Sequence, residues 1–389
     1  MPANKNNMTS TTKTPIYLDN AATTPVDPLV WQEMQPLFEQ FTANPSSIHS
    51  HGRQAKVIVE KARKTVASLL NASPAEIFFT SGGTEADNTV IQSAVLYGGV
   101  KTIITSPLEH HAVLHTAEAW GKLGLAEVKL VNINSDGDID LAHLERLLAE
   151  SPAALVSLMH GNNEIGNLLD LNAVGALCQQ YGALFHSDTV QTMGHFPHDV
   201  QALPVDFLVG AAHKFHGPKG IGFLYAKAGS KFHPLMHGGA QERNQRGGTE
   251  NVYGMVGLAK ALSLAYEHMD EHMNHIKSVK SYFIEGLKAR FPGIQFNGRS
   301  GEVDNSLYTV LNVRFPNVAD GDMLLFQLDI EKISASGGSA CSSGTSVGSH
   351  VLSALNPTAT GAAIRFSFSK NNTREEIDRV LEVLERLVK

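Results

Sequence analysis

The amino-acid sequence predicts an α/β protein with a mainly parallel sheet flanked by helices. Between about residues 55 and 225, short apolar runs typical of buried strands alternate with longer segments that have helical spacing. Strands separated by helices imply βαβ units, which build a parallel sheet with helices on both faces. Ligands bind beyond the carboxyl ends of the strands in such a sheet, so the residues that follow each strand are the first candidates for function.

The first predicted helix spans residues 55–71, where apolar residues recur at helical spacing and Pro74 follows the end. A strand over residues 76–80 comes next, and a second helical stretch begins at Thr84. The later apolar runs are predicted to be strands, and they cover residues 102–105, 154–159, 183–186, 206–209 and 221–225.

Beyond about residue 250 the pattern changes, which predicts a smaller α+β domain. A helical stretch over residues 251–290 precedes strands at 306–313 and 363–368 and helices at 320–329 and 373–388. We therefore expect a large domain over residues 15–265 and a small domain over residues 266–389, with the option that the first residues of the large domain pack on the small one. Residues 1–14 are expected to form a flexible tail.

Composition excludes several classes of protein. The 389 residues carry 31 basic and 38 acidic groups, a net charge of −7, so we expect no binding to the phosphate backbone of nucleic acid. No apolar stretch approaches the roughly 18 residues of a bilayer span, and the first residues lack the apolar core of a signal peptide. A scaffold held together by disulfides is excluded, because two cysteines are too few for a chain of this length. Cys178 and Cys341 are therefore expected to be thiols in the cytoplasm.

The first candidate site is Ser81-Gly82-Gly83-Thr84, between a predicted strand and a predicted helix. Glycines allow the backbone to approach an anion, and the start of a helix offers free N–H groups and the positive end of its dipole. The Gly-Lys-Ser/Thr of a P-loop is missing. These residues predict a phosphate cradle, with an ordinary turn capped by Thr84 as the alternative.

Asp188 and Lys214 each follow a further predicted strand. A carboxylate there can hold a protonated ring nitrogen, and the alternative for Asp188 is a helix N-cap. A lysine beside a cleft can lose solvation and become a Schiff-base nucleophile, whereas the alternative is a solvated loop lysine, with Lys219 as the local competitor. Together with the cradle and with Asn163 after another strand, these residues supply the phosphate site, pyridinium partner and reactive lysine that pyridoxal 5′-phosphate requires.

With these residues in place, the sequence resembles the NifS/IscS-type cysteine desulfurases, in the class V aminotransferase group of fold-type I pyridoxal-phosphate enzymes. The resemblance extends from about Ile16 to the C-terminus. Its motifs, in chain order, are YLDNAATTPVDP (17–28), NPSSIHSHG (44–52), FTSGGTEADN (79–88), EHHAV (109–113), MHGNNEIG (159–166), HSDTVQ (186–191), AHKFHGPKGIG (212–222), RGGTEN (246–251), GSACSSG (338–344) and IRFSF (364–368).

The resemblance implies a role for each matching residue. Lys214 binds the cofactor covalently, Asp188 pairs with the pyridinium nitrogen, and His110 stacks on the ring and moves protons. Further cofactor contacts are implied for Gly83, Thr84, Asn163, Gln191, His213 and, from the neighbouring subunit of a homodimer, Thr249. Arg365 binds the substrate carboxylate beside Asn163, and the alternative for Arg365 is a surface ion pair.

Two positions modify this expectation. Of the adjacent histidines His110 and His111, the register of the motif favours His110 as the residue that stacks on the ring. Many relatives carry a serine three residues before the lysine, where this chain has Ala211. One hydrogen bond to the phosphate, worth about 1 kcal/mol or somewhat more, is therefore expected to be missing.

The two cysteines are expected to differ. Cys178 lies in a helical pattern and is predicted to pack in the core. Cys341 lies in the Gly/Ser-rich segment 335–349, which is predicted to be a mobile loop. The resemblance implies that Cys341 attacks the sulfur of L-cysteine, which leaves L-alanine and an enzyme persulfide. A sulfur-acceptor protein, either an iron–sulfur scaffold or another carrier, is the expected partner.

Five alternatives compete with this hypothesis. A selenocysteine lyase or a sulfinate desulfinase shares the cofactor, and a plain aminotransferase has no use for Cys341. A non-catalytic scaffold is disfavoured by the joint presence of the candidate catalytic residues. The segment from His268 to His272 matches the H-x-x-E-H zinc pattern, with a solvated helix face as the simpler interpretation, and no metal is expected.

Overall fold

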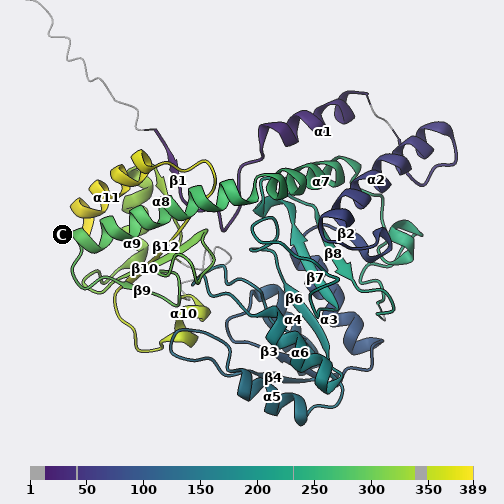
Figure 1. Cartoon of the computed structure of the whole chain (residues 1–389), viewed down its shortest axis with the longest axis horizontal. Coiled ribbons are helices and arrows are strands. Elements are labelled where there is room, and N and C mark those ends of the chain that lie inside the picture. Colours follow the sequence, from purple (N-terminus) through teal and green to yellow (C-terminus); the bar gives the residue numbers. More distant parts are fainter. Residues whose placement is uncertain (1–13, 41–42, 231, 338–347, 389) are drawn as a thin grey trace, which may run out of the picture.

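The computed structural model of the protein describes residues 14–40, 43–230, 232–337 and 348–388. Within these residues lie a seven-stranded sheet, a three-stranded sheet and a two-stranded sheet. Figure 1 shows the large sheet with helices packed around it, and a second body in which the short strands lie against α8, α9 and α11. The α/β class predicted from the alternating pattern is confirmed.

The α-helices are α1 (Pro28–Gln40), α2 (Ser50–Leu69), α3 (Gly83–Leu96), α4 (His111–Lys122), α5 (Leu141–Ala149), α6 (Leu171–Tyr181), α7 (Val252–Glu267), α8 (Met269–Arg290), α9 (Gly321–Ile330), α10 (His350–Leu355) and α11 (Arg374–Val388). The strands are β1 (Ile16–Tyr17), β2 (Ile77–Thr80), β3 (Thr102–Thr105), β4 (Glu127–Leu130), β5 (Ala154–Ser157), β6 (Leu184–Asp188), β7 (Phe207–Ala211), β8 (Gly222–Ala226), β9 (Gln295–Phe296), β10 (Val310–Phe315), β11 (Ile333–Ser334) and β12 (Ala362–Ser367). Short 3-10 helices are η1 (Pro74–Glu76), η2 (Ala212–Lys214) and η3 (Gln241–Asn244).

The large sheet is mainly parallel, as predicted. Its strand order is β2-β8-β7-β6-β5-β3-β4, and the strands from β7 to β4 all pair in parallel. Only β8 runs against its neighbours β7 and β2. Because β3, β5, β6 and β7 point the same way, the residues that follow them gather at one edge of the sheet.

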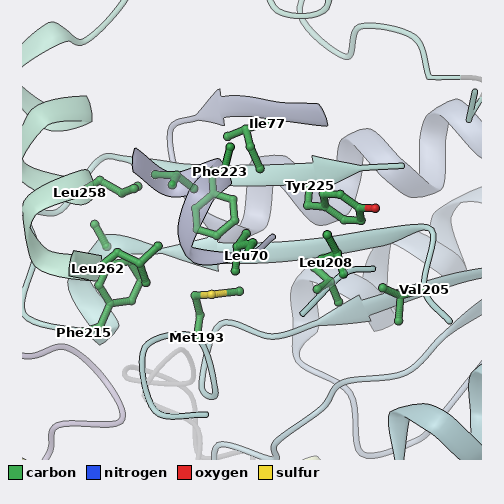
Figure 2. Close-up of a cluster of buried hydrophobic side chains, with 14 of the residues drawn as sticks. Leu70, Ile77, Met193, Val205, Leu208, Phe215, Phe223, Tyr225, Leu258 and Leu262 are labelled. Atoms are coloured by element: carbon green, nitrogen blue, oxygen red, sulfur yellow. The ribbon is translucent and has the colours of Figure 1, made fainter. Parts of the chain in front are cut away.

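Helix α7 packs against the hydrophobic core of the large sheet. Figure 2 shows Leu258 and Leu262 of this helix near Phe215, with Phe223 of β8 to their right and Met193 at the lower right. All five side chains are buried. Each fully buried side chain of this kind contributes roughly 1.5–3 kcal/mol, which fixes α7 against the sheet.

A second hydrophobic cluster holds the short strands together. Ile16 and Leu18 are buried there among residues of α8, β12 and α11, and β1 pairs in parallel with β11. Buried side chains of α7 belong to the first cluster and those of α8 to the second. This change lies close to the domain boundary expected between residues 265 and 266, and we keep that division as a proposal.

Several predicted elements need correction, and the helix predicted over residues 55–71 spans Ser50–Leu69. The helical stretch predicted over residues 251–290 is interrupted at His268, whose φ of −111° and ψ of 19° are not helical. The strand predicted to begin at residue 306 begins at Val310, because Leu307 N bonds the carbonyl of Gly166 rather than a neighbouring strand. Helix α1, strand β4 and helix α10 were not predicted either, and both β4 and α10 are short.

The zinc alternative finds no support in the described ranges. No group of three or more histidine, cysteine, aspartate or glutamate side chains there is arranged to hold a metal ion. His275 Nε2 instead lies 2.9 Å from the carbonyl oxygen of Asn372, and His268 Nδ1 lies 3.1 Å from Glu271 Oε2. In the same ranges, none of the helices combines the length and apolarity that crossing a bilayer requires.

Cys178 packs in the core, as predicted. It lies on α6 with 1% of its surface exposed and belongs to the hydrophobic cluster of the large sheet. Burial raises the pKa of its thiol to about 12, so the reactive thiolate is scarce at neutral pH.

Cys178 should therefore be inert in the folded protein. In a Cys341→Ser variant we expect a thiol reagent such as Ellman's reagent to find no reactive group under native conditions. The same sample should show the remaining thiol after addition of denaturant. Rapid reaction of the folded variant at pH 8 would contradict the burial of Cys178.

Candidate active site

A cavity of about 250 Å³ opens at the carboxyl edge of the large sheet. Its lining combines residues from both bodies of the molecule. Nine residues predicted from the sequence line it together, namely Gly83, Thr84, His110, Asn163, Asp188, Gln191, His213, Lys214 and Arg365. Segments as far apart in the chain as α3 and β12 therefore meet at one site.

The phosphate cradle predicted at residues 81–84 forms the start of α3. The helix has Gly82 at its N-cap without a capping side chain, so Thr84 does not act as the cap. The positive end of the helix dipole faces the cavity through Gly83 and Thr84. A Cβ atom at Gly83 would lie 2.6 Å from Val190 Cγ2, so a larger residue here would force Val190 to shift. The start of α3 can therefore hold an anion.

Asp188 is the last residue of β6 and no helix follows it directly, so the N-cap alternative is wrong. Its Oδ1 accepts a hydrogen bond from Val190 N at 2.8 Å. Burial raises the pKa of Asp188, while the nearby His110 and Lys214 act in the opposite direction. A buried carboxylate of this kind is best stabilised by a cationic partner in the cavity.

Lys214 ends η2, directly after β7, and its side chain reaches the cavity. Its Nζ donates hydrogen bonds to the carbonyl oxygens of Ala21 and Ala22, at 2.5 and 2.9 Å. The competing Lys219 is exposed and is not part of the cavity lining. The solvated-loop alternative for Lys214 is therefore wrong.

His110 is the N-cap of α4, where its Nδ1 accepts a hydrogen bond from Ala112 N at 3.2 Å. Burial is the main reason that the pKa of His110 is lowered, and the positive charge of Lys214 adds to this effect. A neutral imidazole at this place can both accept and donate a proton. His111, the less favoured neighbour, also lines the cavity, and its Nε2 lies 2.9 Å from Nδ1 of His350.

Arg365 lies on β12 with 1% of its surface exposed, so the surface ion-pair alternative is wrong. Its guanidinium donates to the carbonyl oxygen of Asn163 and to Asp19 Oδ1, each at 2.9 Å. Its Nε is buried and has no hydrogen-bond partner in the described residues. Arg365 also lines the cavity, where its guanidinium can bind a carboxylate.

Several residues of the site were not predicted from the sequence. Ala21 and Ala22 enter through the N-terminal segment, and Glu164 and His350 line the side nearest α10. Asp87 lies one turn after Thr84 on α3, and burial followed by the charge of Asp188 raises its pKa well above the ordinary value. The sequence signal for Asp87 was its place at i+3 from Thr84, on the same helix face.

One described residue of the predicted site does not reach the cavity. Thr249 is exposed and does not line it, and its contact with a neighbouring subunit stays a prediction. Cys341 lies outside the described residues, as does most of the segment 335–349 that was predicted to be a mobile loop. Ala211 lines the cavity with its methyl group, at the place where a serine was expected in relatives.

The donor set of the cavity fits pyridoxal 5′-phosphate. The start of α3 suits a phosphate group, Asp188 suits a protonated ring nitrogen, and the amine of Lys214 can react with an aldehyde. The guanidinium of Arg365 in the cavity lining adds a site for the carboxylate of an amino acid.

Comparison with known proteins gives consistent results. Residues 16–380 match the model of the aminotransferase class-V family. A protein named cysteine desulfurase IscS, from Dictyoglomus turgidum, is 42% identical over 97% of this chain and 95% of its own length. A putative cysteine desulfurase IscS 1 from Bacillus subtilis is 40% identical over 96% of this chain and 99% of its own length.

Solved structures agree with the sequence matches. A NifS-like protein superimposes with a TM-score of 0.88 at 37% identity, covering 96% of this chain and 99% of its own. The structure titled "SspA in complex with cysteine" has a TM-score of 0.78 at 30% identity, covering 92% of this chain and 100% of its own. The chain therefore belongs to the class-V aminotransferase family, and its similarity to IscS- and NifS-type proteins is the one that its motifs predicted.

Proposed function

We propose that this protein is a pyridoxal-phosphate-dependent cysteine desulfurase that converts L-cysteine to L-alanine and takes the sulfur onto Cys341. The observation that carries the proposal is the meeting of Lys214, Asp188 and the start of α3 in one cavity. The named cysteine desulfurases that are 40–42% identical over nearly the whole chain support the same activity. The relative whose structure was solved with cysteine supports the substrate.

The chain's own residues divide the work of the reaction. When bound, pyridoxal phosphate supplies an electron sink for the negative charge that forms at the substrate's α-carbon. Asp188 keeps the ring nitrogen protonated, and Arg365 and Asn163 orient the substrate by its carboxylate. Lys214 is placed to take the α-proton and return it, with His110 as a second proton carrier.

Sulfur transfer then needs a thiolate. Cys341 Sγ forms an S–S bond with the substrate sulfur while the carbon–sulfur bond breaks, and that bond's electron pair stays with the substrate carbon. This carbon takes up a proton and leaves as alanine. The persulfide on Cys341 can then be passed to an acceptor thiol of a sulfur-carrier protein, such as an iron–sulfur scaffold.

We further propose that the protein acts as a cytoplasmic homodimer. Thr249 is exposed and stands apart from its own cavity, as expected for a residue that serves a second subunit. Large apolar side chains of α1 and α2 are also exposed, among them Trp31, Phe38 and Val57. An apolar surface of this kind is typical of a subunit interface.

Substrate choice tests the proposal against its closest alternatives. Purified protein with added pyridoxal phosphate should develop a visible absorption band and should release alanine from L-cysteine. L-selenocysteine and L-cysteine sulfinate are offered under the same conditions. A rate on either that far exceeds the rate on L-cysteine would instead favour a selenocysteine lyase or a desulfinase.

Arg365 should control recognition of the substrate carboxylate. Cysteamine is L-cysteine without this carboxylate, so the ratio of kcat/KM for the two compounds isolates the contact. We expect Arg365→Gln to lower the ratio by about 10²-fold, because a charge-assisted hydrogen bond contributes about 1.5–3 kcal/mol. Asp19→Asn breaks the ion pair of Arg365 but keeps the guanidinium, so it should keep the ratio. An unchanged ratio in Arg365→Gln would contradict the assignment.

A further inference from the structure

A bidentate ion pair stands directly behind the phosphate cradle. Glu85 is the residue after Thr84 in the first turn of α3, and Arg246 lies between η3 and α7. Arg246 Nε donates to Glu85 Oε1 at 2.9 Å, and its second terminal nitrogen donates to Glu85 Oε2 at 3.2 Å. The side chains of the glutamate and the arginine are 9% and 22% exposed, so the pair is largely shielded from water.

Glu85 also shapes the cradle itself. Its Oε2 accepts a hydrogen bond from Ser81 N at 2.8 Å, which closes the turn between β2 and α3. Burial by itself raises the pKa of Glu85, but the hydrogen bonds from Arg246 and Ser81 outweigh it and hold the pKa below its ordinary value. Glu85 is therefore a carboxylate at neutral pH.

This carboxylate creates an electrostatic problem for the cradle. A negative charge in the first turn of a helix is favourable for the helix alone, but it opposes a second anion at the same helix end. A phosphate ester carries a charge of about −1.5 to −2 at pH 7. With its charge uncompensated, Glu85 would repel the phosphate that the start of α3 is built to hold.

Arg246 is held in place by the loop that carries it. Glu242, Arg243 and Asn244 have φ values of 44°, 58° and 65°, in the left-handed region that non-glycine residues seldom adopt. The buried carboxylate of Glu242 fixes this strained segment, because both its oxygens bond Arg63, at 2.7 and 2.8 Å. Glu242 also accepts from Phe79 N on β2 at 2.9 Å. The arginine loop is thereby built onto the strand that leads into the cradle.

We propose that Arg246 is a positioning residue for the cofactor phosphate: it neutralises Glu85 at the start of α3, so that Glu85 can shape the cradle without repelling the phosphate. This inference rests on the proposed function. The ion pair leaves the positive helix end available to the incoming anion. The loop that carries Arg246 continues to Thr249, which is expected to contact the cofactor of a second subunit. The same loop is thus tied, through Arg246 and Glu85, to the phosphate cradle of its own subunit.

Cofactor-analogue binding tests the role of the ion pair. Pyridoxine 5′-phosphate lacks the aldehyde that reacts with Lys214, so its affinity reports the phosphate contact without the covalent bond. We measure this affinity by fluorescence titration of the full-length protein from which the cofactor has been removed. We expect Arg246→Gln to weaken its binding about tenfold or more, because a shielded carboxylate is left without its partner. Glu85→Gln and the control Arg243→Gln, which leaves the pair intact, should stay within about threefold of the wild type.

The double variant decides between charge and packing. Glu85→Gln with Arg246→Gln should regain most of the lost affinity, since no uncompensated carboxylate remains. Arg246→Lys keeps the charge and should also bind more tightly than Arg246→Gln. An affinity of Arg246→Gln equal to that of the wild type, or equal losses in the single and double variants, would overturn the proposal.

Failure of the inference can be told from failure of the proposed function. Pyridoxine without its phosphate is titrated against the same proteins, and Arg246→Gln should not change its binding. If the wild-type protein bound neither pyridoxine 5′-phosphate nor pyridoxal 5′-phosphate, the proposed function itself would be wrong. If the wild type bound both and Arg246→Gln bound them equally well, only the role of Arg246 would be wrong.

Discussion

Replacement of Lys214 by alanine should lower the rate of alanine formation from L-cysteine by about 10⁴-fold or more. The reason is that one amine is proposed both to attach the cofactor and to move the α-proton, and proton transfer alone contributes about 10²–10⁴-fold. The Nζ atom already lies at the cavity, held by the carbonyl oxygens of Ala21 and Ala22. The measurement is the steady-state rate with saturating cofactor.

Lys219→Ala is the matched control for this prediction. Lys219 lies five residues further along the same turn but is exposed and absent from the cavity lining. Treatment with borohydride should fix pyridoxal phosphate on the peptide that contains Lys214 in the wild type and in Lys219→Ala. Labelling that is retained in Lys214→Ala and lost in Lys219→Ala would show that the wrong lysine was assigned.

Replacement of Cys341 by serine should abolish desulfuration, with a loss of at least about 10³-fold in alanine formation from L-cysteine. A serine hydroxyl is not ionised at neutral pH, so it cannot attack the substrate sulfur as a thiolate can. Binding of the cofactor should stay unchanged, because its proposed contacts come from other residues. The visible absorption band and the rate of alanine release are therefore measured on the same sample.

Cys178→Ala provides the control, since this thiol is buried on α6 and far from ionisation at neutral pH. It should keep the wild-type rate per folded molecule. L-selenocysteine is a second probe of the Cys341→Ser variant. If the variant still consumed L-cysteine at the wild-type rate, the persulfide mechanism would be wrong, and the aminotransferase alternative would return.

Sequence periodicity predicted the buried strands of the large sheet better than its edge strand β4. Strand β3 was predicted at its observed bounds, because a run of β-branched residues buried on both faces has a clear signature. Strand β4 was missed, since its edge position leaves Glu127 and Leu130 exposed and removes the apolar pattern. The break at His268 was missed because hydrogen bonds continue across it, from His268 N to Leu264 O and from His272 N to His268 O.

Some residues of the site were predicted from the sequence and others were not. Residues that directly follow strands, such as Asp188 and Lys214, were predicted because sheet topology brings strand ends together. The partners of Arg365 were not predicted, because Asp19 is 346 positions away in the chain and the contact depends on how β1 and β12 pack. Glu85 and Arg246 lie within the motifs FTSGGTEADN and RGGTEN, but no role was predicted for either residue. Their pairing joins positions 161 residues apart, which leaves no periodic signal in the sequence.

The central claim is tested most directly by a single turnover of the wild-type protein loaded with pyridoxal phosphate. L-cysteine is added in an amount equal to the enzyme, alanine is quantified, and the protein is analysed by mass spectrometry. We predict one alanine per enzyme and a mass increase of one sulfur atom on the peptide that contains Cys341. Absence of alanine, or alanine formed with no sulfur on that peptide, would contradict the account.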